Sequence, residues 1–192
     1  MSDDMRERIM EATYECVARS GLAKTTVEDV ARNSELSRAT IYRYFPGGKD
    51  DLIQSVVAWE ARRFFLRLAL EVAGAGSLGE LVSMILMRGQ AAVEAHEVLQ
   101  TVLQTEPDLL LRQLSVEGER VLKLIRLYLG PYLEKVSVPD AIPIEGAADY
   151  IARMILSYIT APGSWDLADQ EQVDELVKTQ ILGWLTKGLG NG

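Results

Sequence analysis

The chain has few of the residues from which covalent and metal sites are built. Its 192 residues include one cysteine, Cys16, and one histidine, His96. A single cysteine excludes an internal disulfide framework and favours a reducing compartment. A lone histidine cannot complete a metal site, and it leaves Cys16 and the serines without an obvious base. We therefore expect no metal, no cofactor and no enzymatic activity, and we keep a helical carboxylate enzyme as the catalytic alternative.

Long apolar runs and strand signals are also scarce. The clean apolar runs, such as Met84 to Met87, are too short to cross a bilayer. The first ten residues, MSDDMRERIM, are charged and lack the apolar stretch of a signal peptide. No Asn-Gly or Asp-Gly hairpin joins alternating runs, and no GxGxxG motif follows a strand. These absences predict a cytoplasmic, all-α protein that is not inserted in a membrane.

Basic charge is in deficit, but the deficit is uneven. The net charge is -8, with 20 Lys and Arg against 28 Asp and Glu. Residues 1–50 hold 8 Lys and Arg against 9 Asp and Glu, which leaves 12 against 19 for the remainder. This balance argues against a general polyanion binder, so any contact with nucleic acid must be local to the N-terminal part.

Helical periodicity dominates what is present. Apolar residues between Ile9 and Val17 recur on one face, and Gly21 is placed to end that helix in the left-handed conformation. The pattern predicts about nine helices, forming an N-terminal three-helix head and a C-terminal helical bundle. We expect them at about 3–19, 25–33, 37–44, 49–72, 78–95, 97–114 with a bend or break at Pro107, 115–136, 144–161 and 170–189.

Two short helices separated by the turn Ser-Glu-Leu predict a helix-turn-helix. The first can begin with either of two capping boxes, Thr25 with Glu28 or Thr26 with Asp29. In such a motif the second helix lies in the major groove with its N-terminal residues at the base edges. Those residues are Arg38, Ala39 and Thr40. Arginine can donate two parallel bonds to guanine, while the alanine and the threonine methyl can pack on a thymine methyl.

Further donors cluster around these residues and suit the phosphate backbone. Tyr42, Arg43 and Tyr44 follow along the same predicted helix. Thr26 and Lys49 stand at helix N-termini, where free N–H groups already favour an anion. The opposing interpretation is that tyrosines and arginines on a short exposed helix form only a solvated surface, but the ordered set over about 28 residues favours DNA binding.

The stretch TTVEDVARNSELSRATIYRYFPGGKDDL resembles the N-terminal DNA-binding region of the TetR family of bacterial transcriptional regulators. The resemblance covers about residues 5–58, and it departs in having Pro-Gly-Gly after Phe45 and Tyr44 where histidine is frequent. The elements that carry it are Thr25-Thr26-Val27, Ala31, Ser37, Ile41-Tyr42, Phe45 and Lys49-Asp50-Asp51-Leu52.

This resemblance implies a DNA-binding domain at 1–48 and a ligand-binding and dimerisation domain at 49–192. It implies that Thr26, Ser37, Tyr42, Tyr44 and Lys49 hold phosphates, and that Arg38, Ala39 and Thr40 face bases. It also implies a homodimer on a palindromic double-stranded DNA operator, with repression relieved by a small-molecule effector. The alternatives are a transcriptional activator and a helical ligand-binding or adaptor protein without DNA binding.

The last two predicted helices supply candidate dimer contacts. Each carries an aliphatic and small-residue face, and two such helices from each subunit would make a four-helix interface. The same faces could instead close the core of one subunit. The candidates are Ala148, Ile151, Ile155, Ile159, Val173, Leu176, Val177, Ile181 and Trp184.

The helices between residues 52 and 136 supply candidate pocket residues, although most of them would be core in any helical protein. Methionines and large aliphatics suit an apolar effector. A ligand that binds better to a state in which the recognition helices of the dimer are wrongly spaced would release the DNA. We expect the helix at 49–72 to transmit the change to the head and the segment AHEVLQ to start it. The candidates are Trp59, Met84, Met87, Arg88, His96, Gln100, Leu103, Gln104, Leu124 and Tyr128.

Overall fold

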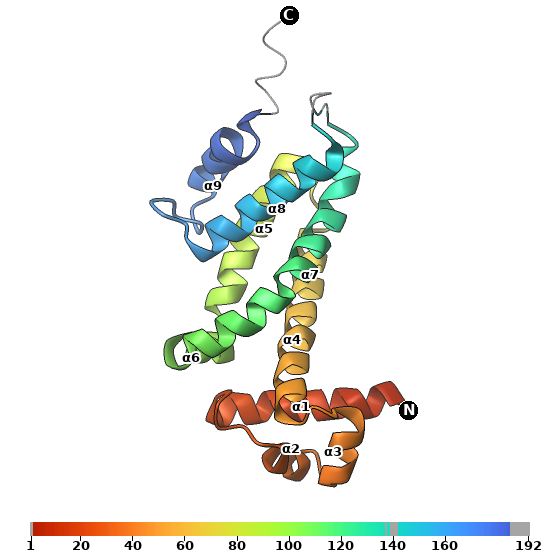
Figure 1. The fold of residues 1–192 in the computed structure, drawn as a ribbon. Helices are drawn as coiled ribbons and strands as arrows, with labels where there is room; N and C mark the ends of the chain where they lie inside the picture. Colours follow the sequence, from red (N-terminus) through yellow and green to blue (C-terminus); the bar gives the residue numbers. More distant parts are fainter. Residues whose placement is uncertain (1, 137, 139–141, 185–192) are drawn as a thin grey trace, which may run out of the picture. The chain divides into compact units, whose positions relative to one another are not determined.

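The computed structural model describes residues 2–136, 138 and 142–184, and these are all-helical, without a strand among them. Nine α-helices and one π-helical turn occupy the described residues, as the periodicity predicted (Figure 1). They are α1 (Ser2–Ser20), α2 (Val27–Asn33), α3 (Arg38–Tyr44), α4 (Lys49–Val72), α5 (Leu78–Glu94), α6 (Glu97–Thr105), α7 (Pro107–Leu133), α8 (Ile144–Thr160), α9 (Gln170–Leu176) and the π-helical η1 (Val177–Ile181). None of the helices searched in this described part is long and apolar enough to span a bilayer.

The chain divides into two compact units. The first comprises residues 1–63 and 96–118, and the second comprises residues 64–95 and 119–192. The predicted head, residues 1–48, lies wholly in the first unit. That unit also takes in the start of α4, all of α6 and the start of α7, which sequence position alone would assign to the body.

The first unit is held together by two apolar clusters. One joins α1, α2, α3 and the start of α4, with Ile9, Val30, Ile41 and Phe45 all at most 1% exposed. The second cluster brings α6 to the head: Val102 packs with Val17, Leu22 and Ile53. The apolar face expected on the first helix is therefore buried, and α6 covers part of the head's own core.

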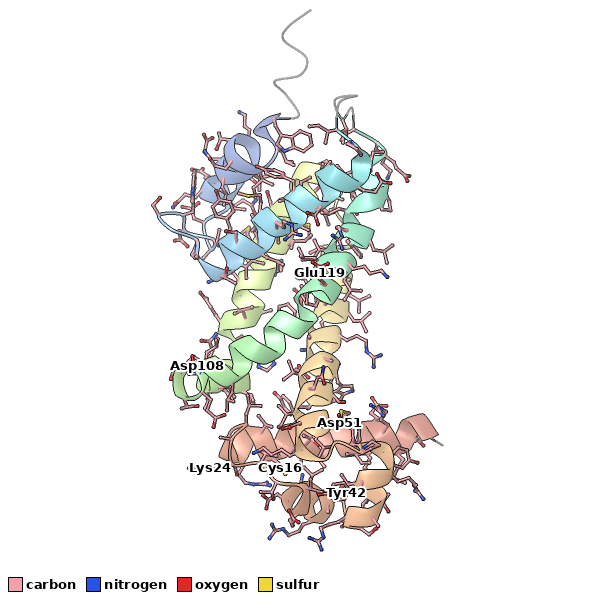
Figure 2. All side chains as sticks on the ribbon, in the orientation of Figure 1. Cys16, Lys24, Tyr42, Asp51, Asp108 and Glu119 are labelled. Carbon is pink, nitrogen blue, oxygen red and sulfur yellow. The ribbon has the colours of Figure 1, made fainter. Side chains whose placement is uncertain are left out.

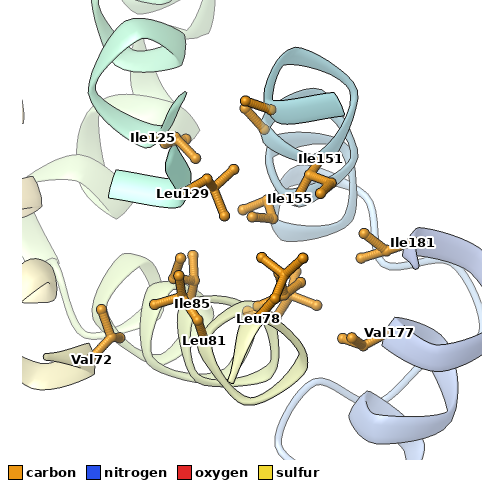
Figure 3. Close-up of a cluster of buried hydrophobic side chains, with 14 of the residues drawn as sticks. Val72, Leu78, Leu81, Ile85, Ile125, Leu129, Ile151, Ile155, Val177 and Ile181 are labelled. Atoms are coloured by element: carbon orange, nitrogen blue, oxygen red, sulfur yellow. The ribbon is translucent and has the colours of Figure 1, made fainter. Parts of the chain in front are cut away.

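The second unit is organised around α5. Its apolar face is covered by α7, α8, α9 and η1, and Figure 3 shows the side chains that meet there. Ser83 of α5 is also buried and donates a hydrogen bond of 2.8 Å to Asp174 of α9, which satisfies its hydroxyl. The labelled members of this core are Val72, Leu78, Leu81, Ile85, Ile125, Leu129, Ile151, Ile155, Val177 and Ile181.

The interruption expected at Pro107 is confirmed, because α6 ends before Glu106 and α7 begins at Pro107. The second break, expected between residues 114 and 115, was wrong, because α7 runs without interruption from Pro107 to Leu133. Proline disfavours the helical conformation of the residue before it, yet it suits the first position of a helix because that position needs no N–H partner. Glu106 accordingly leaves the helical region, with φ -140° and ψ 47°.

The last predicted helix, 170–189, is not one regular α-helix. The α-helical part ends at Leu176, and the backbone N–H of Leu182 then bonds to Val177 five residues back, at 2.8 Å. The π-helical spacing shifts the register of the side chains that follow. The end of this prediction, residues 185–189, lies outside the described residues.

Candidate nucleic-acid interface

The two short helices of the head form a helix-turn-helix because each has its own cap and a shared apolar contact. Thr26 caps α2 by accepting a hydrogen bond from the N–H of Asp29 at 3.1 Å, so the second of the two possible capping boxes is the one formed. Ser37 caps α3 by accepting from the N–H of Thr40, also at 3.1 Å. Glu35 turns the chain between them at φ 54°, in the left-handed region.

One face of α3 is buried and the other is open to solvent. Ile41 is completely buried, which orients the helix on the head. Arg38, Ala39, Tyr42 and Arg43 are exposed, and Figure 2 shows Tyr42 on this helix. Predicted base-facing and phosphate-facing residues thus share one accessible face, as a groove-reading helix requires.

The predicted phosphate ligands differ in how free their polar groups are. The Thr26 hydroxyl donates to the Asp29 carboxylate at 2.6 Å, and this hydrogen bond is the main reason the pKa of Asp29 lies below its usual value. The Ser37 and Thr40 hydroxyls share a hydrogen bond of 2.9 Å. Each hydroxyl has one proton to donate, so Thr26, and whichever of Ser37 and Thr40 donates within their pair, would have to give up this hydrogen bond in order to donate to a phosphate.

The Pro-Gly-Gly segment positions Tyr42 and Lys49. Gly48 has φ +65°, and a Cβ there would lie 3.1 Å from the Tyr42 ring, so glycine permits both the turn and the close ring contact. Lys49 begins α4, and its ammonium group donates to the backbone carbonyl of Ala23 in the α1–α2 connection. Lys49 therefore links the start of α4 to that connection.

Arg38 is the base-reading candidate with a charged partner. Its Nη1 donates to Glu28 Oε1 on α2 at 2.7 Å, while both side chains remain more than half exposed. This hydrogen bond is the main reason the pKa of Glu28 lies below its usual value and the pKa of Arg38 lies above. The guanidinium is thus tied to α2 in the absence of DNA.

Sequence reasoning did not identify Arg6 as part of this region. Its guanidinium lies 4.5 Å from the centre of the Phe45 ring and donates to the carbonyl of Tyr44 at 3.3 Å, at the end of α3. The residue is exposed on α1 and separated from Tyr44 by 38 positions. No local sequence signal predicts that contact.

Glu106, at the end of α6, is a second residue that the sequence did not reveal. Its carboxylate accepts hydrogen bonds from the backbone N–H of Leu22 at 2.7 Å and of Ala23 at 3.1 and 3.2 Å. A Cβ on Gly21, which has φ +81°, would lie 2.7 Å from Glu106 Oε1. The α1–α2 connection is therefore fixed by a carboxylate from α6 on one side and by Lys49 on the other.

Five predicted pocket residues lie in the first unit. Trp59 is buried with an arginine, Arg63, stacked 4.4 Å from its ring centre. His96 caps α6 by accepting from Leu99 N–H at 3.1 Å, and its Nε2 lies 3.3 Å from the Glu60 carboxylate. Gln100 is half-buried, whereas Leu103 and Gln104 are exposed.

The other five lie in the second unit. Met84 and Met87 are partly buried against the apolar core, and Tyr128 donates a hydrogen bond of 2.7 Å to the carbonyl of Ala69. Arg88 and Leu124 are exposed. Among the residues that the structure describes, no three metal-binding side chains gather into a possible metal site.

Most of the predicted dimer contacts lie inside the second unit. Ile159 and Trp184 are partly exposed, and the Trp184 ring packs edge-on against Tyr150 at 6.0 Å between centres. The others are already covered within one chain, which favours the alternative that these faces close the subunit's core. These buried residues are Ala148, Ile151, Ile155, Val173, Leu176, Val177 and Ile181.

A family model described as "Bacterial regulatory proteins, tetR family" matches residues 9–56. The fatty acid metabolism regulator protein of Bacillus subtilis (strain 168) is 20% identical over 96% of this chain and 95% of its own length.

Solved structures with the same fold include two regulators. The transcriptional regulator FadR from Bacillus subtilis, in complex with stearoyl-CoA, is 18% identical with a TM-score of 0.57, covering 90% of this chain and 97% of its own. The TetR family repressor AlkX from Dietzia sp. strain DQ12-45-1b, implicated in biodegradation of n-alkanes, is 22% identical with a TM-score of 0.64, covering 94% of each chain. At these identities the structural likeness concerns the fold.

Proposed function

We propose that this chain is a transcriptional regulator of the TetR family, whose family model matches residues 9–56, and that it is a repressor that binds a palindromic operator as a homodimer and is released by an apolar effector. The observation that carries the proposal is the exposed face of α3, where Arg38, Ala39, Tyr42 and Arg43 stand opposite the buried Ile41. A local cluster of donors on one helix is what an otherwise acidic protein needs in order to bind DNA.

The roles of the individual residues follow from their positions. We assign Arg38, Ala39 and Thr40 to the bases, and Thr26, Ser37, Tyr42, Arg43, Tyr44 and Lys49 to phosphates. Residues 1–48 would bind DNA, and residues 49–192 would bind the effector and form the dimer. The exposed side chains of α8, including Ile144 and Tyr150 at 40% each, supply apolar surface for the dimer contact beside Ile159 and Trp184.

The effector class is supported by two observations. Met84 and Met87 offer adaptable apolar surface in the second unit. One relative in the same fold is bound to stearoyl-CoA, and another is implicated in n-alkane degradation. We therefore propose a long-chain aliphatic effector and name stearoyl-CoA as the probe with which to test it.

Removing the Tyr42 hydroxyl tests the DNA-binding proposal. We expect the wild type to enrich a short palindrome from sheared genomic DNA of its source, with binding that weakens steeply as salt is raised. Tyr42→Phe should weaken binding by about tenfold per half-site, because a hydrogen bond to a charged phosphate is lost. The readout is fluorescence anisotropy with the enriched palindrome.

Tyr132→Phe is the matched control. It makes the same chemical change on α7 in the second unit, at a half-buried tyrosine whose ring centre lies 5.5 Å from the Lys135 ammonium, so operator affinity should stay at the wild-type value. If the wild type enriches no site at low salt, the protein is better described as a ligand-binding or adaptor protein, and a screen for bound small molecules would follow.

Glu106 is the residue through which we propose that effector binding reaches the head. It joins α6 to the α1–α2 connection, and that connection is also bonded to Lys49, a proposed phosphate ligand. A displacement of α6 would therefore release Leu22 and Ala23 and disturb Lys49. Allosteric couplings of this kind amount to about 1–3 kcal/mol, or roughly 5- to 150-fold in affinity.

Truncating this carboxylate should weaken the coupling. In Glu106→Ala we expect the ratio of operator affinities without and with stearoyl-CoA to fall by roughly tenfold, because the backbone N–H groups lose their acceptor. Anisotropy titrations at fixed acyl-CoA measure the ratio. Val102→Ala, a buried change on the same helix, serves as the comparison for general loosening of α6. An unchanged ratio in Glu106→Ala, with acyl-CoA still bound, would exclude this route.

A further inference from the structure

Glu28 and Arg38 form an ion pair that joins the two helices of the helix-turn-helix. Glu28 lies in the first turn of α2 and Arg38 is the first residue of α3, and Oε1 and Nη1 are 2.7 Å apart. The other described pairs in the head are different: Arg32–Asp29 lies within α2, and Arg8–Glu35 joins α1 to the turn. The carboxylate on the reading arginine has no role in the function proposed so far.

We propose that Glu28 is a positioning residue that holds the Arg38 guanidinium in the orientation needed to contact guanine, and that it thereby determines base specificity at this position of the operator. The inference rests on the proposed DNA-binding function. It adds an acidic residue of α2 to the specificity determinants proposed at the N-terminal end of α3.

The geometry of the guanidinium allows both contacts at once. Arginine presents its N–H groups in a rigid planar fork. A carboxylate on Nη1 occupies one part of that fork and leaves N–H groups along its other edge for guanine O6 and N7. The bond also restricts the torsions of a long side chain before DNA arrives, so less conformational entropy is lost on binding.

The pair matters more at the DNA surface than in the free protein. Both side chains are largely exposed now, at 64% for Arg38 and 57% for Glu28, and exposed ion pairs contribute little. Docking into the groove removes water and lowers the effective dielectric, which strengthens the same interaction. A glutamate is charged at neutral pH, and the Arg38 hydrogen bond lowers the pKa of Glu28 further, so both partners carry their charges under binding conditions.

The negative charge also acts against the wrong sites. A carboxylate close to the phosphates weakens sequence-independent binding, which depends on charge alone. At sites with guanine, the contact between Arg38 and the base offsets the repulsion between Glu28 and the phosphates. At sites without guanine, the repulsion is not offset. Glu28 should therefore lower non-specific affinity and increase the discrimination in favour of guanine.

Selection from a randomised operator library, followed by sequencing, tests the inference. We expect Glu28→Ala to reduce guanine discrimination at the Arg38 position by about fivefold, with the other positions unchanged, and to raise non-specific affinity. Glu28→Gln should raise non-specific affinity similarly but retain most of the discrimination, because its amide oxygen still accepts from Arg38. Glu11→Gln, an exposed neutralisation on α1, controls for net charge.

A double-mutant cycle shows whether Glu28 acts through Arg38. In an Arg38→Ala background, adding Glu28→Ala should leave the base profile unchanged, since there is no guanidinium to orient. The inference is overturned if Glu28→Ala alone leaves guanine discrimination intact, if the loss spreads equally over all positions, or if Gln and Ala lose it equally. If the wild type enriches no sequence at all, the proposed function fails first, and thermal unfolding of each variant identifies a merely structural defect.

Discussion

Arg38→Ala is expected to reduce affinity for the operator by roughly 5- to 150-fold per half-site, because a bidentate arginine–guanine contact is worth about 1–3 kcal/mol of discrimination. In a homodimer the two half-sites multiply this factor. Affinity for unrelated DNA should fall by less, because there the substitution removes one positive charge and leaves Glu28 unpaired but breaks no base contact. Competition anisotropy with operator and scrambled duplexes measures both quantities.

The matched control removes the same charge from the neighbouring helix. Arg32→Ala on α2 deletes an exposed arginine that is likewise paired with an acid, Asp29. It should affect operator and scrambled DNA alike, as a phosphate contact or a bystander would. If the ratio of operator affinity to scrambled-DNA affinity falls equally in Arg32→Ala and Arg38→Ala, Arg38 contributes only its charge and does not distinguish bases.

Ile151→Ala is expected to lower the free energy of unfolding by about 2–5 kcal/mol, the usual cost of emptying a fully buried aliphatic site. Ile151 is completely buried and packs among α5, α7 and α8 in the second unit (Figure 3). Hydrogen exchange should show the loss in the amides of α5 and α8, while those of α1 to α3, which belong to the other unit, keep their protection. Urea unfolding of the wild type and of Ile151→Ala measures the change in the free energy of unfolding.

This substitution also decides between the two interpretations of the last helices. If Ile151 belongs to the subunit's core, Ile151→Ala lowers the free energy of unfolding. The dissociation constant of the dimer, measured by sedimentation, then rises only as far as subunits unfold. If Ile151 is instead a dimer contact, the dissociation constant of the dimer rises, while the free energy of unfolding of the separated subunit is unchanged. Ser157→Ala, an exposed change on the same helix, should leave both measurements unaltered.

How far the sequence predicts the head is best seen at its caps. Ser37 and the Pro-Gly-Gly turn were located from residue type alone, because capping and left-handed turns depend on a few adjacent residues. The choice between Thr25 and Thr26 as the cap of α2 was open. Burial decided it: Thr25 is 2% exposed and donates to the carbonyl of Gly21, which leaves Thr26 to cap.

The packing partners of the helices in the second unit were harder to predict than the caps of the head. The apolar stripes of α8 and α9 were found correctly, but a stripe shows only that a face is covered, not what covers it. Burial of Ile155, Val173 and Leu176 within one chain came from packing against α5. The interruption at Pro107 was predicted correctly from the proline, whereas the further break expected after residue 114 was wrong because α7 continues to Leu133.

The sequence by itself determined that this protein is helical, where its helix-turn-helix lies and which donors its reading helix carries. Periodicity, caps and turns are written in short windows of residues. Only the tertiary structure showed that Glu28 holds Arg38 and that Glu106 binds the backbone of Leu22, 84 positions away. Such contacts depend on how the helices pack against one another. Packing is driven by burial of apolar residues from the whole chain, so a short stretch of sequence does not predict it.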